Sequence, residues 1–383
     1  MSQVCAVLGA DHHLHRRGKF KAVEARENLV RVNLQDKSYD IEIDRGVLSS
    51  LAGRLAERCE LSHCVVITDD NVRSPHAELV VNDLQAAGCE THLLVVPPGE
   101  RSKSIDQTAQ LWNSVLESGA HRQTVIIAVG GGVIGDLAGF VAGSFARGLR
   151  FVQVPTTLLA QVDSSVGGKV GINLPGAKNM VGHFWQPKFV LIDTDVLATL
   201  PEREYRSGLA EVVKYGVIMD AEFFDYLEHH ADAINAREPE ALRHVVTRCC
   251  RLKADVVEED ELETSGRRAI LNYGHTFAHA FETVLGYGTL LHGEAVAIGM
   301  LCASRLAESL GLFTAEETRR QQALLQQLEL PVDVPDADRV LLLDAMRHDK
   351  KVQSGKLRFI LPTKIGHVQL VGDIDSKLVT AVM

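Results

Sequence analysis

Two histidines lie four residues apart in the segment LNYGHTFAHA, residues 271–280. On a helix this spacing places His275 and His279 one above the other on the same face. Such a pair can share one metal ion, can carry out acid–base chemistry, or can fill a polar notch in a protein core. The spacing by itself favours a chelating pair and leaves the other two interpretations open.

Other residues of the metal-ligand type stand elsewhere in the chain. Glu211 lies one helical turn before Lys214 in LAEVVKYG, and His292 heads the segment LLHGEAVAIGM. A glutamate and two or three histidines from different helices suit a catalytic divalent metal in a pocket that is open on one side. A lone histidine is more often structural than a ligand, so the hypothesis depends on the whole set.

A glycine-rich turn, AVGGGVIGD at 128–136, follows a predicted strand and opens a predicted helix. Glycines allow the backbone to approach a pyrophosphate, and the start of a helix attracts anions. No acidic residue follows about twenty positions later, so this is not an ordinary Rossmann fingerprint, and a tight packing turn explains it equally well. Polar segments at the ends of two earlier strands, TDDN (68–71) and PGERSK (98–103), favour a nucleotide.

The segment QVDSSVGGKVGINLPGAKNMVGHFWQP, residues 161–187, is rich in glycine and has no acid after Asp163. Val follows Gly168-Lys169, so it is not a Walker A loop. Its interleaved apolar residues favour a packed anion cradle around Lys169, Lys178 and Asn179 over a mobile surface loop. Between residues 137 and 192 Asp163 is the only acid, where the chain average predicts about seven. A small phosphorylated or carboxylated substrate fits this charge pattern.

Strands alternate with helical stretches in the first half of the chain, which predicts an α/β domain with a mostly parallel sheet. After Leu200-Pro201 the apolar residues recur at spacings of three and four, typical of helices, and GKLRFILPTKIGHVQLV is expected to form a hairpin. We therefore expect a flexible extension at 1–30, an α/β domain at 31–195 and a mainly helical domain at 196–383. The active site should lie in the cleft between the two domains.

The overall composition limits the classes of function. The chain has 383 residues, a net charge of −10 and 46% hydrophobic residues, which argues against nucleic acid or an anionic membrane as a partner. Its seven cysteines contain no CxxC pair, as expected for reduced thiols in the cytoplasm. Its first residues predict no secretory signal, and no apolar run reaches membrane-spanning length.

Five motifs in this order give the chain a family resemblance: GGGVIGDLAGFVA, FVQVPTTLLAQVDSSVGGKVGINLPGAKNMVG, SGLAEVVKYG, LNYGHTFAHAFE and HGEAVAIGM. From about residue 40 to 370 it resembles the 3-dehydroquinate synthases of the sugar phosphate cyclase superfamily. The resemblance implies a homodimer that uses NAD and one zinc or cobalt ion. It also implies conversion of 3-deoxy-D-arabino-heptulosonate 7-phosphate to 3-dehydroquinate and phosphate in the shikimate pathway, by transient oxidation, phosphate elimination, re-reduction and aldol closure.

The resemblance also implies a role for individual residues. The implied metal ligands are Glu211, His275 and His292, which leaves His279 to face the departing phosphate. The implied substrate contacts are Asp163, Lys169, Asn179, Lys214, Lys253, Arg268, Asn272, His279 and Lys350 or Lys351, with Arg147 lent by the dimer partner. The implied NAD contacts are Asp69, Asn71, Glu100, Lys103, Gly131, Gly132, Val133, Asp136, Thr156, Thr157, Lys169, Lys178, Thr199 and Leu200.

Three other functions remain to be compared with this one. Sister cyclases act on sedoheptulose 7-phosphate or glucose 6-phosphate, which lack a carboxylate, whereas Arg268 with Asn272 resembles the dehydroquinate type. A metal-dependent polyol dehydrogenase has neutral substrates and no need for the cluster of Lys169, Lys214 and Lys253. An inactive NAD-binding regulator would not require the full set of catalytic groups.

Overall fold

The computed structural model describes residues 28–175, 177–286, 288–348 and 357–383. Lys350 and Lys351, expected at the substrate site, lie outside the described residues, as does most of the extension predicted at 1–30. The first strand begins at Leu29, so the last two residues assigned to that extension belong to the sheet.

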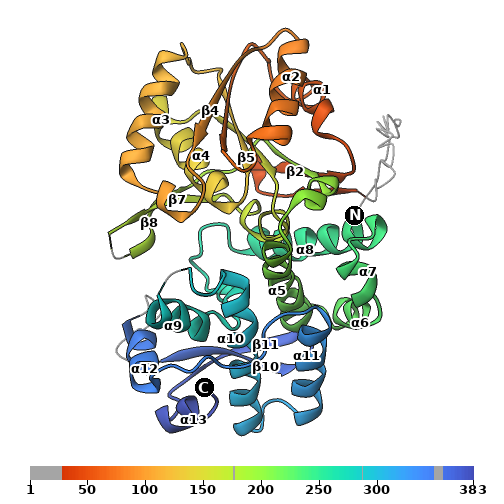
Figure 1. The fold of residues 1–383 in the computed structure, drawn as a ribbon, viewed down its shortest axis with the longest axis vertical. Coiled ribbons are helices and arrows are strands. Elements are labelled where there is room, and N and C mark those ends of the chain that lie inside the picture. The colour runs from red at the N-terminus through yellow and green to blue at the C-terminus, as the bar shows by residue number, and fades with distance from the viewer. Residues whose placement is uncertain (1–27, 176, 287, 349–356) are drawn as a thin grey trace, which may run out of the picture.

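A seven-stranded sheet forms the upper half of the molecule in Figure 1. Its strand order is β1-β2-β9-β6-β5-β3-β4, and every neighbouring pair is parallel except β1 and β2. The strands are β1 (Leu29–Val32), β2 (Tyr39–Asp44), β3 (His63–Asp69), β4 (Glu90–Val96), β5 (Val125–Gly130), β6 (Arg150–Pro155) and β9 (Phe189–Asp193). The predicted mostly parallel sheet is confirmed.

Helices cover both faces of this sheet, as a parallel sheet requires. Along β3, Val65 and Ile67 face a core shared with α3 (Ile105–Glu117) and α4 (Gly132–Ser144). Cys64 and Val66 alternate with them and face α1 (Leu51–Ala56) and α2 (Glu78–Ala86) on the other side. Because successive side chains of a strand point to opposite faces, the unbroken apolar run of β3 supplies both cores.

Part of the glycine-rich segment at 161–187 is a β-hairpin, which the sequence did not predict. Its strands β7 (Lys169–Leu174) and β8 (Ala177–Phe184) pair in antiparallel fashion and β7 packs on α4. A Cβ on Gly171 would lie 2.7 Å from the carbonyl oxygen of Val181, and one on Gly182 would lie 2.3 Å from that of Val170. These glycines therefore permit the close pairing, although glycine is usually a signal against a strand.

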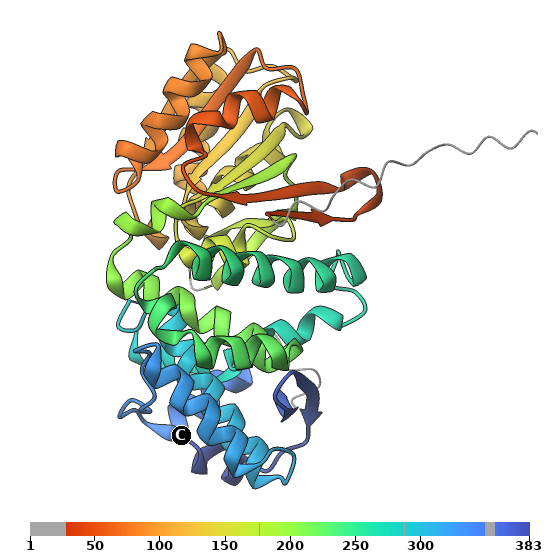
Figure 2. The same ribbon diagram turned by 90° about the vertical axis from the view of Figure 1, so that its right-hand side faces the viewer.

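The second half of the chain is mainly helical and lies below the sheet in both views (Figures 1 and 2). Its elements are α5 (Glu202–Met219), α6 (Ala221–His229), α7 (Ala231–Asn235), α8 (Pro239–Glu259), α9 (His275–Leu285), α10 (His292–Ser309), α11 (Ala315–Gln327), α12 (Arg339–His348), α13 (Ser376–Ala381) and the hairpin β10 (Arg358–Lys364) and β11 (His367–Gly372). The predicted late hairpin is present. Among the described residues, no helix combines the length and apolar character needed to cross a membrane.

Helix α5 joins the two halves through a close contact at Gly208. A Cβ on Gly208 would lie 2.7 Å from Cβ of Leu158 and 2.8 Å from the backbone nitrogen of Leu159, just after β6. Helix α5 therefore approaches the carboxyl edge of the sheet more closely than it could if position 208 carried a side chain. The residues that α5 carries are brought to that edge by this contact.

We predict that Gly208→Ala lowers the free energy of unfolding by about 1–3 kcal/mol, because the added methyl group overpacks this contact. Gly53→Ala is the matched control, since Gly53 is exposed on α1 with no atom within 4 Å of an added Cβ. The control should raise stability by roughly 0.5–1 kcal/mol, the usual gain from alanine in a helix. Urea unfolding of both variants measures the difference, and equal midpoints for the two would contradict the prediction.

Candidate active site

Three residues of the metal-ligand type converge from three helices. Glu211 comes from the middle of α5, and His275 and His292 are the first residues of α9 and α10. Each offers one ligand atom, and these atoms all lie within 4.8 Å of one another. Oε1 of Glu211 lies 3.6 Å from Nε2 of His275 and 3.9 Å from Nε2 of His292. Ligand atoms that share a tetrahedral zinc ion lie roughly 3.3 Å apart, so a small inward shift would complete such a site.

The hydrogen-bond partners of the two histidines favour metal binding. Nδ1 of His275 lies 3.1 Å from the carbonyl oxygen of Tyr273, and Nδ1 of His292 lies 3.5 Å from Oε1 of Glu282. Both partners are acceptors, so each Nδ1 can donate its proton there, and each Nε2 is the nitrogen that can present a lone pair to an ion. Both lone pairs are on the nitrogen nearer Glu211. These residues therefore fit a divalent ion by their chemistry as well as by their positions.

His279 lies beside this group but is not part of it. Its ring centroid is 5.7 Å from that of His275 and 6.4 Å from that of His292. Within the described residues, the group that could hold a metal here contains Glu211, His275 and His292 but not His279. The chelating pair suggested by local spacing is therefore not the arrangement that the structure brings together, whereas the three-residue set remains a prediction about metal binding.

Charged residues continue from Glu211 toward the sheet. Lys214 contacts Oε2 of Glu211, and its ammonium lies 3.9 Å from Oδ1 of Asp163. Lys253 of α8 donates to Oδ1 of Asp163 at 2.9 Å and to the Asp163 carbonyl at 2.6 Å. The hydroxyl of Tyr215 donates to the same carboxylate at 2.8 Å. Asp163 thus links the segment after β6 to both α5 and α8.

This cluster shifts the pKa values of its members. Burial alone would raise the pKa of Asp163, but Lys253, Lys214 and Tyr215 outweigh it and hold that pKa well below its usual range. Burial lowers the pKa of Lys253, against the opposing effect of Asp163. Burial also lowers the pKa of Lys214, but Glu211 and Asp163 outweigh this effect, so the pKa of Lys214 is raised overall. The cluster therefore holds an ionised carboxylate beside two buried amines.

Arg268 lies under the loop at 260–266, with only 2% of its surface exposed. Its Nη1 donates to the carbonyl oxygen of Glu261 at 2.7 Å. A Cβ on Gly167 would lie 2.5 Å from Nη2, so that glycine makes room for the guanidinium. Nε is buried and has no hydrogen-bond partner among the described residues. Asn272 ends the same turn, at Arg267–Asn272.

The β7–β8 hairpin places its lysines against the helical half. Lys169 pairs with Glu263 at 2.7 Å and is half exposed, while Nζ of Lys178 lies 3.7 Å from Oε1 of Glu282. Asn179 accepts from Nζ of Lys103 at 2.5 Å, so the hairpin also contacts the segment after β4.

The predicted NAD residues gather along the carboxyl edge of the sheet. Asp69 ends β3, and the others follow β3 (Asn71), β4 (Glu100, Lys103), β5 (Gly131, Gly132, Val133, Asp136), β6 (Thr156, Thr157) and β9 (Thr199, Leu200). This edge includes the point between β3 and β5 where the strand order reverses direction, which is where open α/β sheets bind ligands. Lys178, on the hairpin, is the remaining NAD prediction besides Lys169.

The turn before α4 packs tightly at Gly130, and the first amides of the helix have no capping side chain. A Cβ on Gly130 would lie 2.6 Å from Cβ of Ile134, so packing requires that glycine. Gly131 is the N-cap of α4 and provides no capping side chain, and the first turn contains no acid. The amides of this turn lack intrahelical acceptors and can therefore bind an anion. The buried hydroxyl of Thr156, at the end of β6, also lacks a partner among the described residues.

Other polar groups at this edge already have partners. Lys103 is buried and donates to Asp136 at 2.7 Å. Glu100 accepts from Asn173 at 2.7 Å, and Thr199 pairs with His76 at 2.7 Å. Burial raises the pKa of Asp69, although the amides of Val72 and Asn71 oppose this by donating to its carboxylate.

Arg147 lies away from this site within its own chain. It is exposed on the turn Phe145–Arg147 that follows the C-terminal end of α4. The 13 residues of α4 span about 20 Å, and the candidate site is at the other end of the helix. Its predicted role therefore depends on a second copy of the chain.

Sequence reasoning missed Glu282, Tyr215 and Glu263 as neighbours of predicted site residues. Glu282 lies three residues after His279 and seven after His275, which places all three on one face of α9. That spacing is visible in the sequence and could have identified it.

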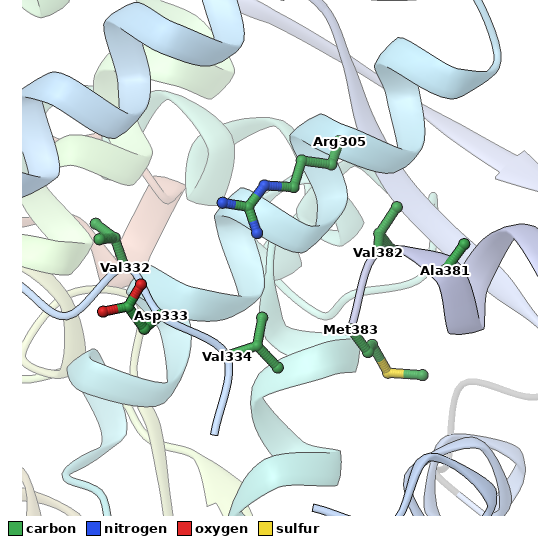
Figure 3. Close-up of a pocket in the computed structure, with 7 residues that line it drawn as sticks. All are labelled: Arg305, Val332, Asp333, Val334, Ala381, Val382 and Met383. Carbon is green, nitrogen blue, oxygen red and sulfur yellow. The ribbon is translucent and has the colours of Figure 1, made fainter. Parts of the chain in front are cut away.

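A separate hollow of about 430 Å³ lies in the helical half (Figure 3). It is lined by Arg305 of α10 and by residues 332–334 and 381–383, so it contains none of the predicted site residues.

We predict that Asp163→Asn lowers the free energy of unfolding by roughly 2–3 kcal/mol at pH 7, because it leaves the buried amine of Lys253 without its carboxylate and removes one of the two carboxylates beside Lys214. A carboxylate whose pKa is depressed by folding stabilises the protein above its unfolded pKa, near 3.9, and this contribution is lost only as the pH falls below that value. Urea unfolding should therefore give the same difference from wild type at pH 7 and pH 5.

Asp195→Asn is the control for this prediction. Asp195 pairs with Arg45 at 2.8 Å, but both side chains are about half exposed, so the change should cost under about 1 kcal/mol. A difference between Asp163→Asn and wild type that disappears already at pH 5 would contradict the assigned ionisation.

The chain is similar to curated proteins over nearly its whole length. It is 53% identical over 358 residues to a 3-dehydroquinate synthase of Rhodopirellula baltica, covering 92% of this chain and 96% of that protein. It is 45% identical over 359 residues to a 3-dehydroquinate synthase of Nostoc punctiforme, covering 93% and 99%.

The chain is also similar, at lower identity, to solved structures of other enzymes. A 2-epi-5-epi-valiolone synthase from Streptomyces hygroscopicus with NAD+ and Zn2+ bound is 32% identical with a TM-score of 0.83, covering 91% of this chain and 97% of that one. A 2-deoxy-scyllo-inosose synthase complexed with carbaglucose-6-phosphate, NAD+ and Co2+ is 28% identical with a TM-score of 0.85, covering 92% and 98%. A glycerol dehydrogenase from Schizosaccharomyces pombe, 19% identical over 89% of this chain and 87% of that one with a TM-score of 0.63, shares the fold.

Two sequence families match adjoining parts of the chain. Residues 93–207 match the family described as 3-dehydroquinate synthase N-terminal, and residues 208–352 match 3-dehydroquinate synthase C-terminal. Together with the two curated relatives, these matches mean that the chain belongs to the 3-dehydroquinate synthase family.

Proposed function

We propose that the protein converts 3-deoxy-D-arabino-heptulosonate 7-phosphate to 3-dehydroquinate and phosphate, as a phosphorus–oxygen lyase of the shikimate pathway. The observation that carries the proposal is the 53% identity to a 3-dehydroquinate synthase over 92% of the chain. The convergence of a three-residue metal-ligand group and a cluster of buried lysines supports it. A small anionic sugar needs both features in one cleft.

The site is suited to one divalent ion and one NAD. Glu211, His275 and His292 would hold Zn2+ or Co2+, and the residues along the carboxyl edge of the sheet would hold NAD with its pyrophosphate at the start of α4. When bound, the ion supplies Lewis acidity and NAD takes up and returns a hydride.

The protein's own residues bind and orient the substrate. The ionised carboxylate of Asp163 can accept from sugar hydroxyls, while Lys214 and Lys253 keep it ionised and can donate to the same hydroxyls. His279, next to the metal-ligand group, would donate to the phosphate and carry a proton away from it. Lys169 and Asn179, on the hairpin, would complete the phosphate contacts.

Arg268 and Asn272 would bind the substrate carboxylate, which distinguishes this reaction from those of the sister cyclases. The Nε of Arg268 has no partner among the described residues and is a buried donor that a carboxylate would satisfy. Because only 2% of Arg268 is exposed, we expect the loop at 260–266 to move when substrate binds.

We also propose a homodimer in the cytoplasm, in which each copy lends Arg147 to the phosphate site of the other. The exposed position of Arg147, about 20 Å from the start of α4, supports a role in a neighbouring copy. The domain boundary that we propose at 195 and 196 lies between the end of β9 at Asp193 and the start of α5 at Glu202.

The main assignment is tested by phosphate release from 3-deoxy-D-arabino-heptulosonate 7-phosphate with NAD+ and Zn2+, with sedoheptulose 7-phosphate as the competing substrate. We expect release from the first and not from the second. Arg268→Lys should raise KM for the heptulosonate about 10-fold or more, because a lysine cannot form the paired hydrogen bonds of a guanidinium.

Arg267→Lys is the matched control, since Arg267 is exposed and pairs with Glu259 on the surface. It should leave KM unchanged. Turnover of sedoheptulose 7-phosphate together with an unaffected Arg268→Lys variant would favour the sister cyclases.

We predict that variants of the two histidines in LNYGHTFAHA differ in the amount of metal that they bind. His275→Ala should lose the bound ion because it removes one of three ligands, whereas His279→Ala should retain the ion and lose most activity. Metal analysis of both purified variants measures this. Loss of metal from both would restore the chelating pair of His275 and His279.

A further inference from the structure

Glu282 has no role in the function proposed above, although it ends the motif LNYGHTFAHAFE. We infer that Glu282 is a positioning residue that orients His292 for metal binding and connects it to the β7–β8 hairpin through Lys178. The inference rests on the proposed use of a divalent ion. It goes beyond that proposal because it assigns a residue outside the ligand set.

The position of Glu282 on α9 makes this role possible. It lies seven residues after His275, two turns along the same face of the helix, and only 8% of its surface is exposed. Its Oε1 lies 3.5 Å from Nδ1 of His292. Helix α9 therefore supplies one metal ligand and also the carboxylate that faces the ligand carried by α10.

The chemistry of this contact determines which nitrogen of His292 is available. A carboxylate at this position accepts from Nδ1 of His292, so Nε2 is the nitrogen that can present a lone pair on the side of Glu211. Carboxylates commonly hold metal-bound histidines in this way. His275 receives the same support from the backbone carbonyl of Tyr273, which no side-chain substitution removes. A change at Glu282 should therefore disturb one ligand and leave the other in place.

The same carboxylate oxygen also faces the other half of the molecule. Oε1 of Glu282 lies 3.7 Å from Nζ of Lys178, which comes from β8. This ion pair helps to hold the side chain of Glu282 between α10 and the hairpin. A metal ligand is thus joined through one buried carboxylate to a residue that is predicted to contact NAD.

The hairpin contains a second pair of the same type that serves as a control. Lys169 of β7 pairs with Glu263 at 2.7 Å, but both side chains are exposed by 40% or more. Among the described residues, Glu263 is not part of the group that could hold a metal. Removing the charge of Glu263 therefore weakens one link between hairpin and helices without changing the support of His292.

The test measures metal affinity directly and without substrate. Full-length wild type, Glu282→Gln, Glu282→Asp and Glu263→Gln are stripped of metal and titrated with Co2+ against a competing chelator. We expect Glu282→Gln to bind the ion about 10–100-fold more weakly, the usual effect of losing such a support. Glu282→Asp should fall between it and wild type, and Glu263→Gln should match wild type.

Two further readouts separate positioning from a general loss of structure. The visible absorption of bound Co2+, which reports ligand geometry, should change in Glu282→Gln and not in Glu263→Gln. The unfolding midpoints of the metal-free variants should stay close to that of wild type. If Glu282→Gln binds Co2+ as tightly as wild type with the same spectrum, the inference is wrong while the proposed function stands. If wild type binds no Co2+ or Zn2+, both are wrong.

Discussion

The structure of the site depends on one buried carboxylate. Glu211 is 1% exposed, and an ionised carboxylate in that environment costs several kcal/mol unless it is paired. Lys214 contacts one of its oxygens and two imidazoles face the other. Close packing of α5, α9 and α10 brings these groups together. For example, a Cβ on Gly293 would lie 1.8 Å from the carbonyl oxygen of Ser207, so α10 can reach α5 only with a glycine beside His292.

A second carboxylate joins this centre to the sheet. Asp163 follows β6, yet its partners Lys214, Tyr215 and Lys253 all belong to helices of the second half. The site is therefore formed where the carboxyl edge of a parallel sheet meets the helices, and neither half contains it alone. The two ion pairs of the hairpin, from Lys169 and Lys178, cross the same boundary.

Most of the fold could be predicted because its signals are local. The apolar run of β3 and the three and four spacing in α5 and α8 each identify an element without reference to the rest of the chain. The hairpin β7–β8 could not be predicted in this way. Gly171 and Gly182 break the alternation of a strand, and the reason for them is the close approach of the opposite backbone, which only pairing creates.

The sequence by itself determined the family, through long motifs in a fixed order, and the residue types available to the site. Its local spacing favoured His275 and His279 as a pair, because both lie on one face of α9. In the tertiary structure, a different set, Glu211, His275 and His292, has the geometry that a metal needs. Histidines four apart on one helix can share an ion, but here the rings of His275 and His279 lie at 89° to each other with 5.7 Å between their centroids. Among the described residues, the group that could hold a metal leaves His279 out. Helices α5 and α10 bring Glu211 and His292 toward His275 from other directions, which a single helix cannot do.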